Sequence, residues 1–262
     1  MRRALFAAVL VLAIACAACA PVRPASVPMA TRALGGSSGG AGGCLVLFLP
    51  GRRDKLGDYG RRSFPEMAAR AGLVAQFVEA DAHLGYYKAE TITARLYEDV
   101  VAPARARGVE RIWIVGISMG GLGAILYARS HSEGLGGVVA LAPFLGDEEP
   151  RLVAAAGGLR SYTMGAPRAV GDYERGLWGW LKRYTAEGAD RPPIWLGLGT
   201  QDDLAWADRL LADALPPGRA FVEKGGHDWR TWSRLWQDVL DAGILQRDCG
   251  RIADLGSEGL LE

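Results

Sequence analysis

Ile112-Trp113-Ile114-Val115-Gly116-Ile117-Ser118-Met119-Gly120 passes from an apolar run typical of a buried strand into a tight turn. Gly121-Leu122-Gly123-Ala124-Ile125-Leu126-Tyr127 follows and has a helical pattern. Small residues at both ends of G-x-S-x-G let the chain reverse sharply, so the serine hydroxyl projects from the turn. The next helix offers free backbone N–H groups to a developing negative charge. We therefore expect Ser118 to be a nucleophile.

The same five-residue pattern occurs once more, at Gly36-Ser37-Ser38-Gly39-Gly40. That copy lies in a Gly/Ser-rich stretch with no strand before it and no periodic helix after it. A short motif is informative only in its structural context. The strand before Ser118 and the helix after it therefore separate Ser118 from this second match.

Apolar runs alternate with helical patterns along most of the chain, which predicts a parallel sheet covered on both faces. The predicted strands are 44–49, 73–80, 111–117, 137–143, 194–198 and 219–223. The predicted helices are about 63–71, 90–107, 120–130, 204–214 and 229–242. We expect one α/β domain over 44–262 with a sheet of about six strands.

An insertion at about 145–191 interrupts this alternation and is rich in Trp and Tyr. We expect it to lie over the site as a small cap that favours apolar groups of a substrate. The alternative is that its aromatic side chains form a satellite core beneath a long connection.

The first residues have the pattern of a bacterial export signal: Arg2 and Arg3 precede an apolar run from Ala4 to Ala15. The end of this run resembles the cleavage region of bacterial lipoproteins, with Cys19 or Cys16 as the lipidated residue. We expect a signal peptide over 1–18, a flexible tether over 19–43, and a lipid-anchored protein of the cell envelope. A soluble periplasmic or secreted protein is the alternative.

Charge argues against a nucleic-acid partner. The chain has a formal net charge of +1, which becomes −1 when residues 1–18 with their two arginines are removed. The arginines are scattered rather than gathered into a basic patch. We expect a small-molecule partner, with membrane contact only through the anchor; the oligomeric state stays open.

Cysteines and histidines do not form a metal-binding pattern. The three histidines, His83, His131 and His227, are far apart in sequence, and no C-x-x-C occurs outside the signal region. Cys44 and Cys249 are an even pair in a compartment that permits oxidation. Either a disulfide or two separate thiols fits this pattern.

From Cys44 to Ala242 the chain resembles the α/β-hydrolase family, on four ordered motifs. They are Leu45-Val46-Leu47-Phe48-Leu49-Pro50-Gly51-Arg52, the turn Gly116–Gly121, Leu196-Gly197-Leu198-Gly199-Thr200-Gln201-Asp202-Asp203, and Gly225-Gly226-His227-Asp228-Trp229. Serine, then acid, then histidine is the chain order of that family. In a parallel sheet the loops after the strands also lie along one edge, so these residues converge.

The resemblance implies a catalytic triad of Ser118, Asp202 and His227. His227 would take the hydroxyl proton, and the acid would hold its tautomer. We prefer Asp202 to its neighbour Asp203 because the family usually places the acid three residues after the glycine that closes the strand, here Gly199. Asp203 would then cap the helix beginning at Leu204.

The oxyanion hole would combine the backbone N–H groups of Met119 and Arg52. Many family members have His-Gly where this chain has Pro50-Gly51, so a histidine that orients this loop is absent. Pocket candidates follow the second predicted strand: Asp81, His83 and Tyr87. For His83 the alternative is a loop histidine with local hydrogen bonds.

The expected activity is hydrolysis of a carboxylic ester through an acyl-enzyme at Ser118, as in a carboxylesterase or a small lipase. No cofactor is required for this chemistry. A thioesterase or an acyltransferase could use the same triad, and a non-catalytic binding module of the envelope could keep the fold.

Overall fold

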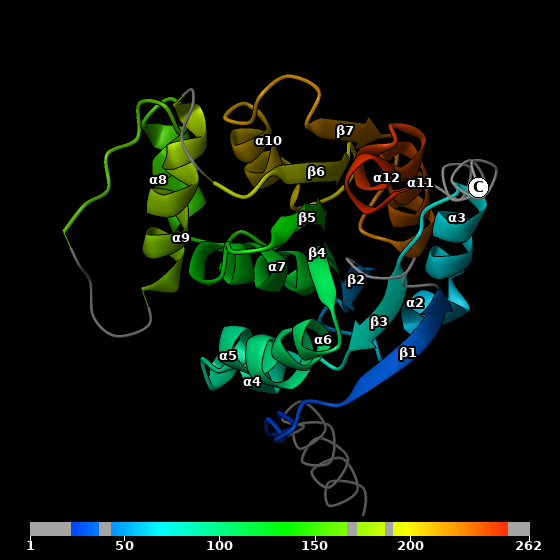
Figure 1. Cartoon of the computed structure of the whole chain (residues 1–262). Coiled ribbons are helices and arrows are strands. Elements are labelled where there is room, and N and C mark those ends of the chain that lie inside the picture. Colours follow the sequence, from blue (N-terminus) through cyan, green and yellow to red (C-terminus); the bar gives the residue numbers. More distant parts are fainter. Residues whose placement is uncertain (1–21, 37–42, 167–171, 187–190, 251–262) are drawn as a thin grey trace, which may run out of the picture.

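A computed structural model describes residues 22–36, 43–166, 172–186 and 191–250 (Figure 1). The two predicted features of the N-terminus, the signal peptide and the lipidated cysteine, lie outside these residues. The strands are β1 (Thr31–Gly36), β2 (Gly43–Leu49), β3 (Gln76–Ala80), β4 (Val109–Ile117), β5 (Leu135–Leu141), β6 (Ile194–Gly199) and β7 (Ala220–Glu223). They form one seven-stranded sheet in the order β1-β3-β2-β4-β5-β6-β7.

All neighbouring strands of this sheet are parallel except β1, which runs antiparallel to β3. The helices are α2 (Asp58–Arg61), α3 (Phe64–Arg70), α4 (Leu84–Lys88), α5 (Ile92–Leu96), α6 (Ala102–Ala106), α7 (Met119–Ser130), α8 (Glu149–Ala155), α9 (Tyr173–Leu181), α10 (Ala205–Ala212), α11 (Trp229–Asp241) and α12 (Ile244–Cys249). Two further turns are the π-helix η1 (Tyr97–Val101) and the 3-10 helix η2 (Lys182–Thr185). The predicted α/β-hydrolase fold is confirmed.

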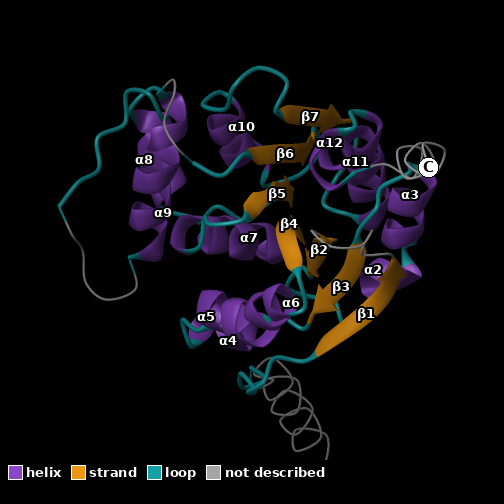
Figure 2. Cartoon of the chain, in the orientation of Figure 1, coloured by secondary structure: helices purple, strands orange, loops and turns teal. Residues whose placement is uncertain are grey.

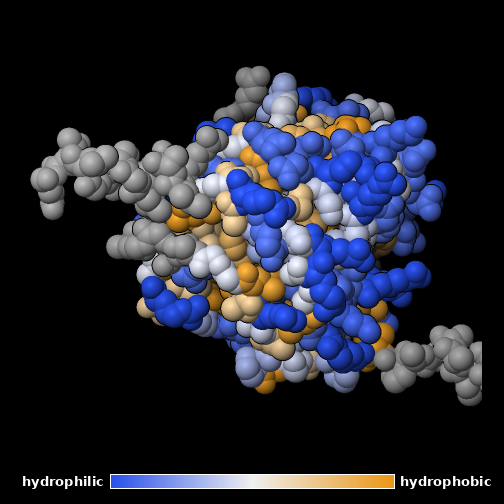
Figure 3. All heavy atoms as spheres, turned by 90° about the vertical axis from the view of Figure 1, so that its right-hand side faces the viewer, coloured by the Kyte–Doolittle hydropathy of each residue, from blue (hydrophilic) through white to orange (hydrophobic). Residues whose placement is uncertain are grey.

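Helices cover both faces of the sheet, so the central strands are buried on both sides (Figure 2). Alternate residues of β2 enter different cores, because successive side chains of a strand point to opposite faces. Leu45 and Leu47 belong to the core on the α7 side of the sheet, whereas Val46 and Phe48 belong to the core on the side of α3 and α11. On the outer side of α3 and α11, hydrophilic side chains cover much of the surface (Figure 3).

The flexible tether predicted over 19–43 is wrong for residues 31–36, which form edge strand β1. Thr31 pairs with Ala80 of β3, and the buried Met29 donates its backbone N–H to Asp99 at 2.7 Å. The side chains of β1 are mostly exposed. An edge strand of this kind has no apolar alternation in its sequence, so the prediction of six strands missed it.

The helix predicted over 90–107 is divided into α5, η1 and α6. Pro103, at the start of α6, has no N–H to donate to a carbonyl in the preceding turn. The wider π turn of η1 directly precedes it. The hydrophobic period predicted the extent of the helix but could not predict this change of helix type.

The insertion at 145–191 contributes α8 and α9, beside α7 in Figure 1. Most of its described aromatic side chains are not on a cap surface. Tyr162, Trp178 and Tyr184 are buried, and Trp178 Nε1 donates to the carbonyl of Leu145 at 2.9 Å. Tyr173 is exposed by 39% and lines a cavity. These buried side chains belong to the same core as α7 and the central strands, so the insertion extends the main core instead of forming a separate satellite core. It supplies only a small part of the site.

Cys44, the second residue of β2, and Cys249, at the end of α12, form a disulfide. The bond joins the centre of the sheet to the last described helix across a sequence separation of 205 residues. The pairing that the sequence left open is therefore present in the structure.

Candidate active site

Ser118 occupies a strained position between β4 and α7. Its φ of 54° lies in the left-handed region, which L-residues with a side chain seldom adopt. A Cβ on Gly116 would lie 2.1 Å from the carbonyl oxygen of Gly120, and one on Gly120 would lie 2.1 Å from that of Leu49. Only glycine fits at these two positions. The packing of the turn therefore explains the small residues on either side of Ser118.

Ser118, His227 and Asp202 form a continuous chain of hydrogen bonds. The Oγ of Ser118 lies 2.9 Å from Nε2 of His227. On the other side of the ring, Nδ1 of His227 lies 2.7 Å from Oδ2 of Asp202. A proton on Nδ1 leaves Nε2 free to accept the serine proton. Because the three residues follow β4, β6 and β7, the carboxyl edge of the parallel sheet brings them together.

Asp202, and not Asp203, is the acid that contacts His227. The side chain of Asp202 is fully buried, and its second oxygen accepts the backbone N–H of Leu204 at 2.8 Å. Asp203 is exposed. The predicted helix cap at Asp203 is wrong. The helix α10 begins at Ala205, one residue after the predicted start at Leu204, and the backbone N–H of Leu204 donates to Asp202.

A second carboxyl group, that of Asp208, lies in the core behind Asp202. Asp208 is fully buried, and neither of its oxygens has a hydrogen-bond partner among the described residues. Burial, reinforced by the charge of Asp202, raises the pKa of Asp208 well above its usual range.

His227 itself is partly open to solvent, with 34% of its side chain exposed. The ring of Trp232 packs edge-on against it, with the ring centroids 5.0 Å apart. Asp228, the next residue, caps α11 by accepting the backbone N–H of Thr231 at 2.9 Å. The loop that carries His227 is therefore fixed by the cap of α11, and the imidazole ring is accessible to solvent.

The turn after β2 brings Gly51 against the nucleophile. A Cβ on Gly51 would lie 3.5 Å from Cβ of Ser118. Arg52 and Met119, the two predicted oxyanion donors, line the same cavity as Ser118. Asp54 holds the turn from the other side: Oδ2 accepts the N–H of Gly51 at 2.9 Å.

Asp54 was not predicted as a site residue. Its second oxygen accepts the indole N–H of Trp229 at 3.1 Å, so one carboxylate links the turn after β2 to the segment that follows His227. Burial raises the pKa of Asp54 despite these two hydrogen bonds. An aspartate three residues after Gly51 is a local signal for a side-chain-capped turn, and it could have been noticed.

Of the three predicted pocket residues, only Tyr87 lines the cavity at Ser118. Asp81 instead forms an ion pair with Arg23, with Nη2 and Oδ1 2.6 Å apart. Nδ1 of His83 accepts the backbone N–H of Gly85 at 3.1 Å and so caps α4. The prediction of Asp81 as a pocket residue is wrong, because Arg23, distant in sequence, pairs with it. For His83 the alternative holds: it is a loop histidine with a local hydrogen bond. Burial lowers the pKa of His83.

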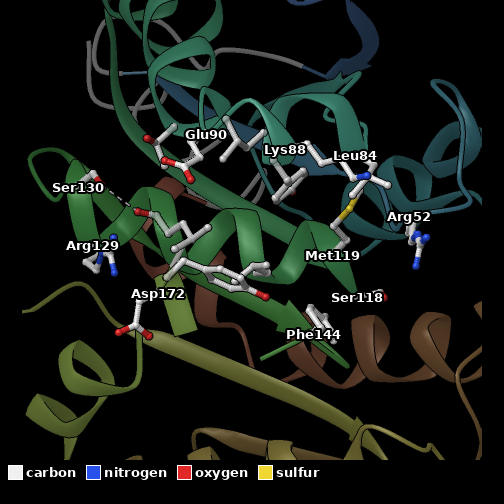
Figure 4. Close-up of a pocket in the computed structure, with 16 residues that line it drawn as sticks. Arg52, Leu84, Lys88, Glu90, Ser118, Met119, Arg129, Ser130, Phe144 and Asp172 are labelled. Atoms are coloured by element: carbon white, nitrogen blue, oxygen red, sulfur yellow. Dashed lines mark hydrogen bonds between the residues drawn. The ribbon is translucent and has the colours of Figure 1, made fainter. Parts of the chain in front are cut away.

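A cavity of about 910 Å³ begins at Ser118 and follows α7 (Figure 4). Arg52, Ser118 and Met119 lie at one end of it in this view. Glu90, Arg129, Ser130 and Asp172 lie at the other. Between the two ends the wall is largely apolar, with Leu122, Leu126 and Ile92 among its residues.

The described residues hold no group of three or more His, Cys, Asp or Glu side chains arranged to bind a metal ion. Within the same ranges, no helix combines the length and the apolar character needed to cross a bilayer.

Comparison with known proteins places this site in a family context. The family model described as "Putative esterase" matches residues 36–242, which is most of the chain. No curated protein matches the sequence significantly.

Solved structures share the fold at low sequence identity. A ferulic acid esterase is 20% identical, with a TM-score of 0.54 over 79% of this chain and 85% of that chain. An S-formylglutathione hydrolase from Agrobacterium tumefaciens is 15% identical, with a TM-score of 0.53 over 86% and 93%. The fluorophosphonate-binding serine hydrolase FphF of Staphylococcus aureus is 17% identical, with a TM-score of 0.52 over 76% and 83%. These similarities show an α/β-hydrolase fold.

Proposed function

This chain belongs to the esterase family that its residues 36–242 match, and from that premise we propose that it is a carboxylesterase with Ser118, His227 and Asp202 as its catalytic triad. The observation that carries the proposal is the unbroken hydrogen-bond chain from Ser118 Oγ through His227 to the buried Asp202. A serine hydroxyl is a weak nucleophile by itself. An oriented base beside it is what makes acyl transfer practicable.

The first half-reaction forms an acyl-enzyme. Oγ of Ser118 attacks the ester carbonyl carbon while Nε2 of His227 takes the hydroxyl proton. The carbonyl oxygen becomes an oxyanion, which the backbone N–H groups of Met119 and Arg52 stabilise. Collapse of this intermediate breaks the bond to the alcohol oxygen, and His227 returns the proton to that oxygen as the alcohol leaves.

The second half-reaction releases the acid. Water attacks the acyl-serine while His227 accepts one of its protons, and the proton returns to Ser118 Oγ when the carboxylic acid departs. One oxyanion donor lowers the activation barrier of such a step by about 3 kcal/mol, and a positioned base increases the rate by about 10²- to 10⁴-fold. These groups are sufficient for ester cleavage.

The test is labelling with a fluorophosphonate probe together with hydrolysis of p-nitrophenyl butyrate. We expect wild-type protein to be labelled and to turn over the ester, and Ser118→Ala to do neither while keeping the wild-type circular dichroism spectrum. Folded wild-type protein that neither reacts with the probe nor hydrolyses the ester would overturn the proposal. It would favour a binding module instead. A thioester with the same acyl group tests for a thioesterase.

We also propose that the protein is exported and anchored through a lipid on Cys19, or on Cys16. The disulfide between Cys44 and Cys249 supports export, because such bonds persist in oxidising compartments. Mass spectrometry of the mature N-terminus in the membrane fraction tests the proposal. An unmodified alanine or proline at the N-terminus would overturn it.

A further inference from the structure

We propose that the acyl group of the substrate is an extended, uncharged hydrocarbon chain, so that the natural esters are those of medium- to long-chain fatty acids. The inference rests on the proposed function, because it places the acyl chain relative to Ser118 as nucleophile. It goes further by assigning a ligand to the cavity that follows α7.

The cavity has the length for such a chain. Met119, Leu122, Leu126 and Arg129 all line it and are spaced by three or four residues, so they lie on one side of α7. At 1.5 Å of rise per residue, this row runs for about 15 Å from the nucleophile end. In Figure 4 Met119 lies near Ser118, and Arg129 lies at the opposite end.

The walls facing α7 are also apolar. Leu84 and Tyr87 of α4 form one part, and Phe144 and Tyr173 form another. Tyr87 can approach α7 closely because Gly123 has no side chain: a Cβ there would lie 2.3 Å from the tyrosine oxygen. A hydrocarbon chain bound in this cavity would therefore be removed from water on several sides. This burial of apolar surface favours binding in proportion to the length of the chain.

Charges of both signs lie around the cavity beyond the nucleophile end. Lys88 and Arg129 supply positive charges, Glu90 supplies a negative charge, and the carboxylate of Asp172 forms an ion pair with Arg175. The stretch of wall along α7 between Met119 and Arg129 carries the apolar side chains of Leu122 and Leu126. Glu90 and Arg129 are exposed, so the far end of the cavity meets solvent.

The position of His227 assigns the cavity to the acyl side of the ester. The alcohol oxygen must lie beside His227, because the histidine returns the proton to it. The described wall comes from α4, α5, α7 and the segment around Phe144 and Tyr173, and it does not include His227 or Asp202. A chain bound in the cavity therefore extends from Ser118 in the direction away from His227. This is the direction expected for the acyl chain, because the alcohol lies on the side of His227.

The experiment compares kcat/KM for p-nitrophenyl acetate, butyrate, octanoate and laurate, each below its micelle-forming concentration. We expect an increase with acyl length of up to about fourfold per methylene as far as octanoate. The values of kcat/KM for butyl acetate and octyl acetate should differ by less than about threefold, which is no more than the effect expected of a single methylene group. Three results would each overturn the inference. The first is a kcat/KM that falls from butyrate to laurate, and the second is a higher kcat/KM for methyl ferulate than for methyl octanoate. The third is a kcat/KM that depends on the length of the alcohol instead of the acyl group.

Leu126→Trp blocks the cavity partway along α7, and Leu152→Trp is its matched control on an exposed position of α8. We expect Leu126→Trp to lower kcat/KM for laurate at least about tenfold more than kcat/KM for butyrate, since several methylenes of laurate lose their site. The control should match wild type. Equal losses on both esters would contradict the inference, and the wild-type series decides the matter if Leu126→Trp does not fold. Absence of fluorophosphonate labelling in wild type would instead reject the proposed function.

Discussion

The carboxylate of Asp54 accepts the backbone N–H of Gly51 at 2.9 Å, and the backbone N–H of Asp54 donates back to the carbonyl of Gly51 at 3.1 Å. This reciprocal pair closes the turn that holds the proposed oxyanion donor of Arg52 beside Ser118. Through Trp229, the same carboxylate also reaches the segment that follows His227. Asp54 thus occupies a position from which it can orient the loop after β2.

Removing the side-chain hydrogen bond from Gly51 to Asp54 should weaken stabilisation of the transition state more than it weakens substrate binding. We expect Asp54→Ala to lower kcat for p-nitrophenyl butyrate by about tenfold or more with KM little changed, because a displaced oxyanion donor acts only on the developing charge. Asp54→Asn keeps an oxygen acceptor for Gly51 and should recover most of the rate. If the alanine and asparagine variants are equally slow, Asp54 acts through its charge and not through this turn.

Asp202 and its neighbour Asp203 form a natural pair for a matched substitution. We expect Asp202→Asn to lower kcat by about 10⁴-fold, because an amide N–H opposite Nδ1 of His227 favours the wrong tautomer. Asp203→Asn, at an exposed position, should stay within about twofold of wild type, as surface changes usually do. Steady-state kinetics on one ester, with melting temperatures for both variants, is the measurement. A large loss for Asp203→Asn would show that the acid is wrongly assigned.

The backbone strain at Ser118 should be measurable as stability. A non-glycine residue in this left-handed conformation costs on the order of 1–3 kcal/mol. We therefore expect the free energy of unfolding in urea to be about 1 kcal/mol greater for Ser118→Gly than for Ser118→Ala. The control is the same pair at Ser130, the last residue of α7. There alanine should be the more stable, and the same order at both positions would argue against strain at Ser118.

Glu79 should make the stability of the fold depend on pH. Its side chain is buried, Oε1 has no hydrogen-bond partner among the described residues, and Oε2 accepts the N–H of Gly57 at 2.7 Å. Burial raises the pKa of Glu79 to about 7 from 4.5. Between these values the folded state holds a proton that the unfolded state has lost, so this contribution falls as pH rises.

Glu79→Gln removes this titration and keeps an acceptor for Gly57. We expect the variant and wild type to differ little in free energy of unfolding at pH 4.5. At pH 8 the variant should be more stable, by up to about 3 kcal/mol. Urea unfolding at the two pH values measures the difference. A gap between the proteins that does not change with pH would show that Glu79 is already ionised in the folded state.

Local rules were sufficient for the six parallel strands and for two members of the site. The turn around Ser118 was predictable because its cause lies within five residues: Gly116 and Gly120 leave no room for side chains. Strands buried on both faces show as apolar runs, so β2, β4 and β5 were predicted close to their observed bounds. His227 followed from its place after the last predicted strand.

Edge strand β1 and the partners of isolated polar residues were not predictable in this way. β1 has almost no buried side chains, so no pattern marks it. Asp81 and His83 had the right place in sequence for a pocket, but Arg23 and the N–H of Gly85 hold them elsewhere. The direction of a loop side chain depends on which donors are near it in space, and sequence order does not give that information.

The sequence by itself determined the six parallel strands and placed Ser118 on a sharp turn, because hydrophobic period and steric exclusion act over a few residues. The tertiary structure decided between Asp202 and Asp203, paired Cys44 with Cys249, and set Asp54 against Gly51. These outcomes depend on segments distant in the chain, which meet only when the packed sheet aligns the carboxyl ends of its strands.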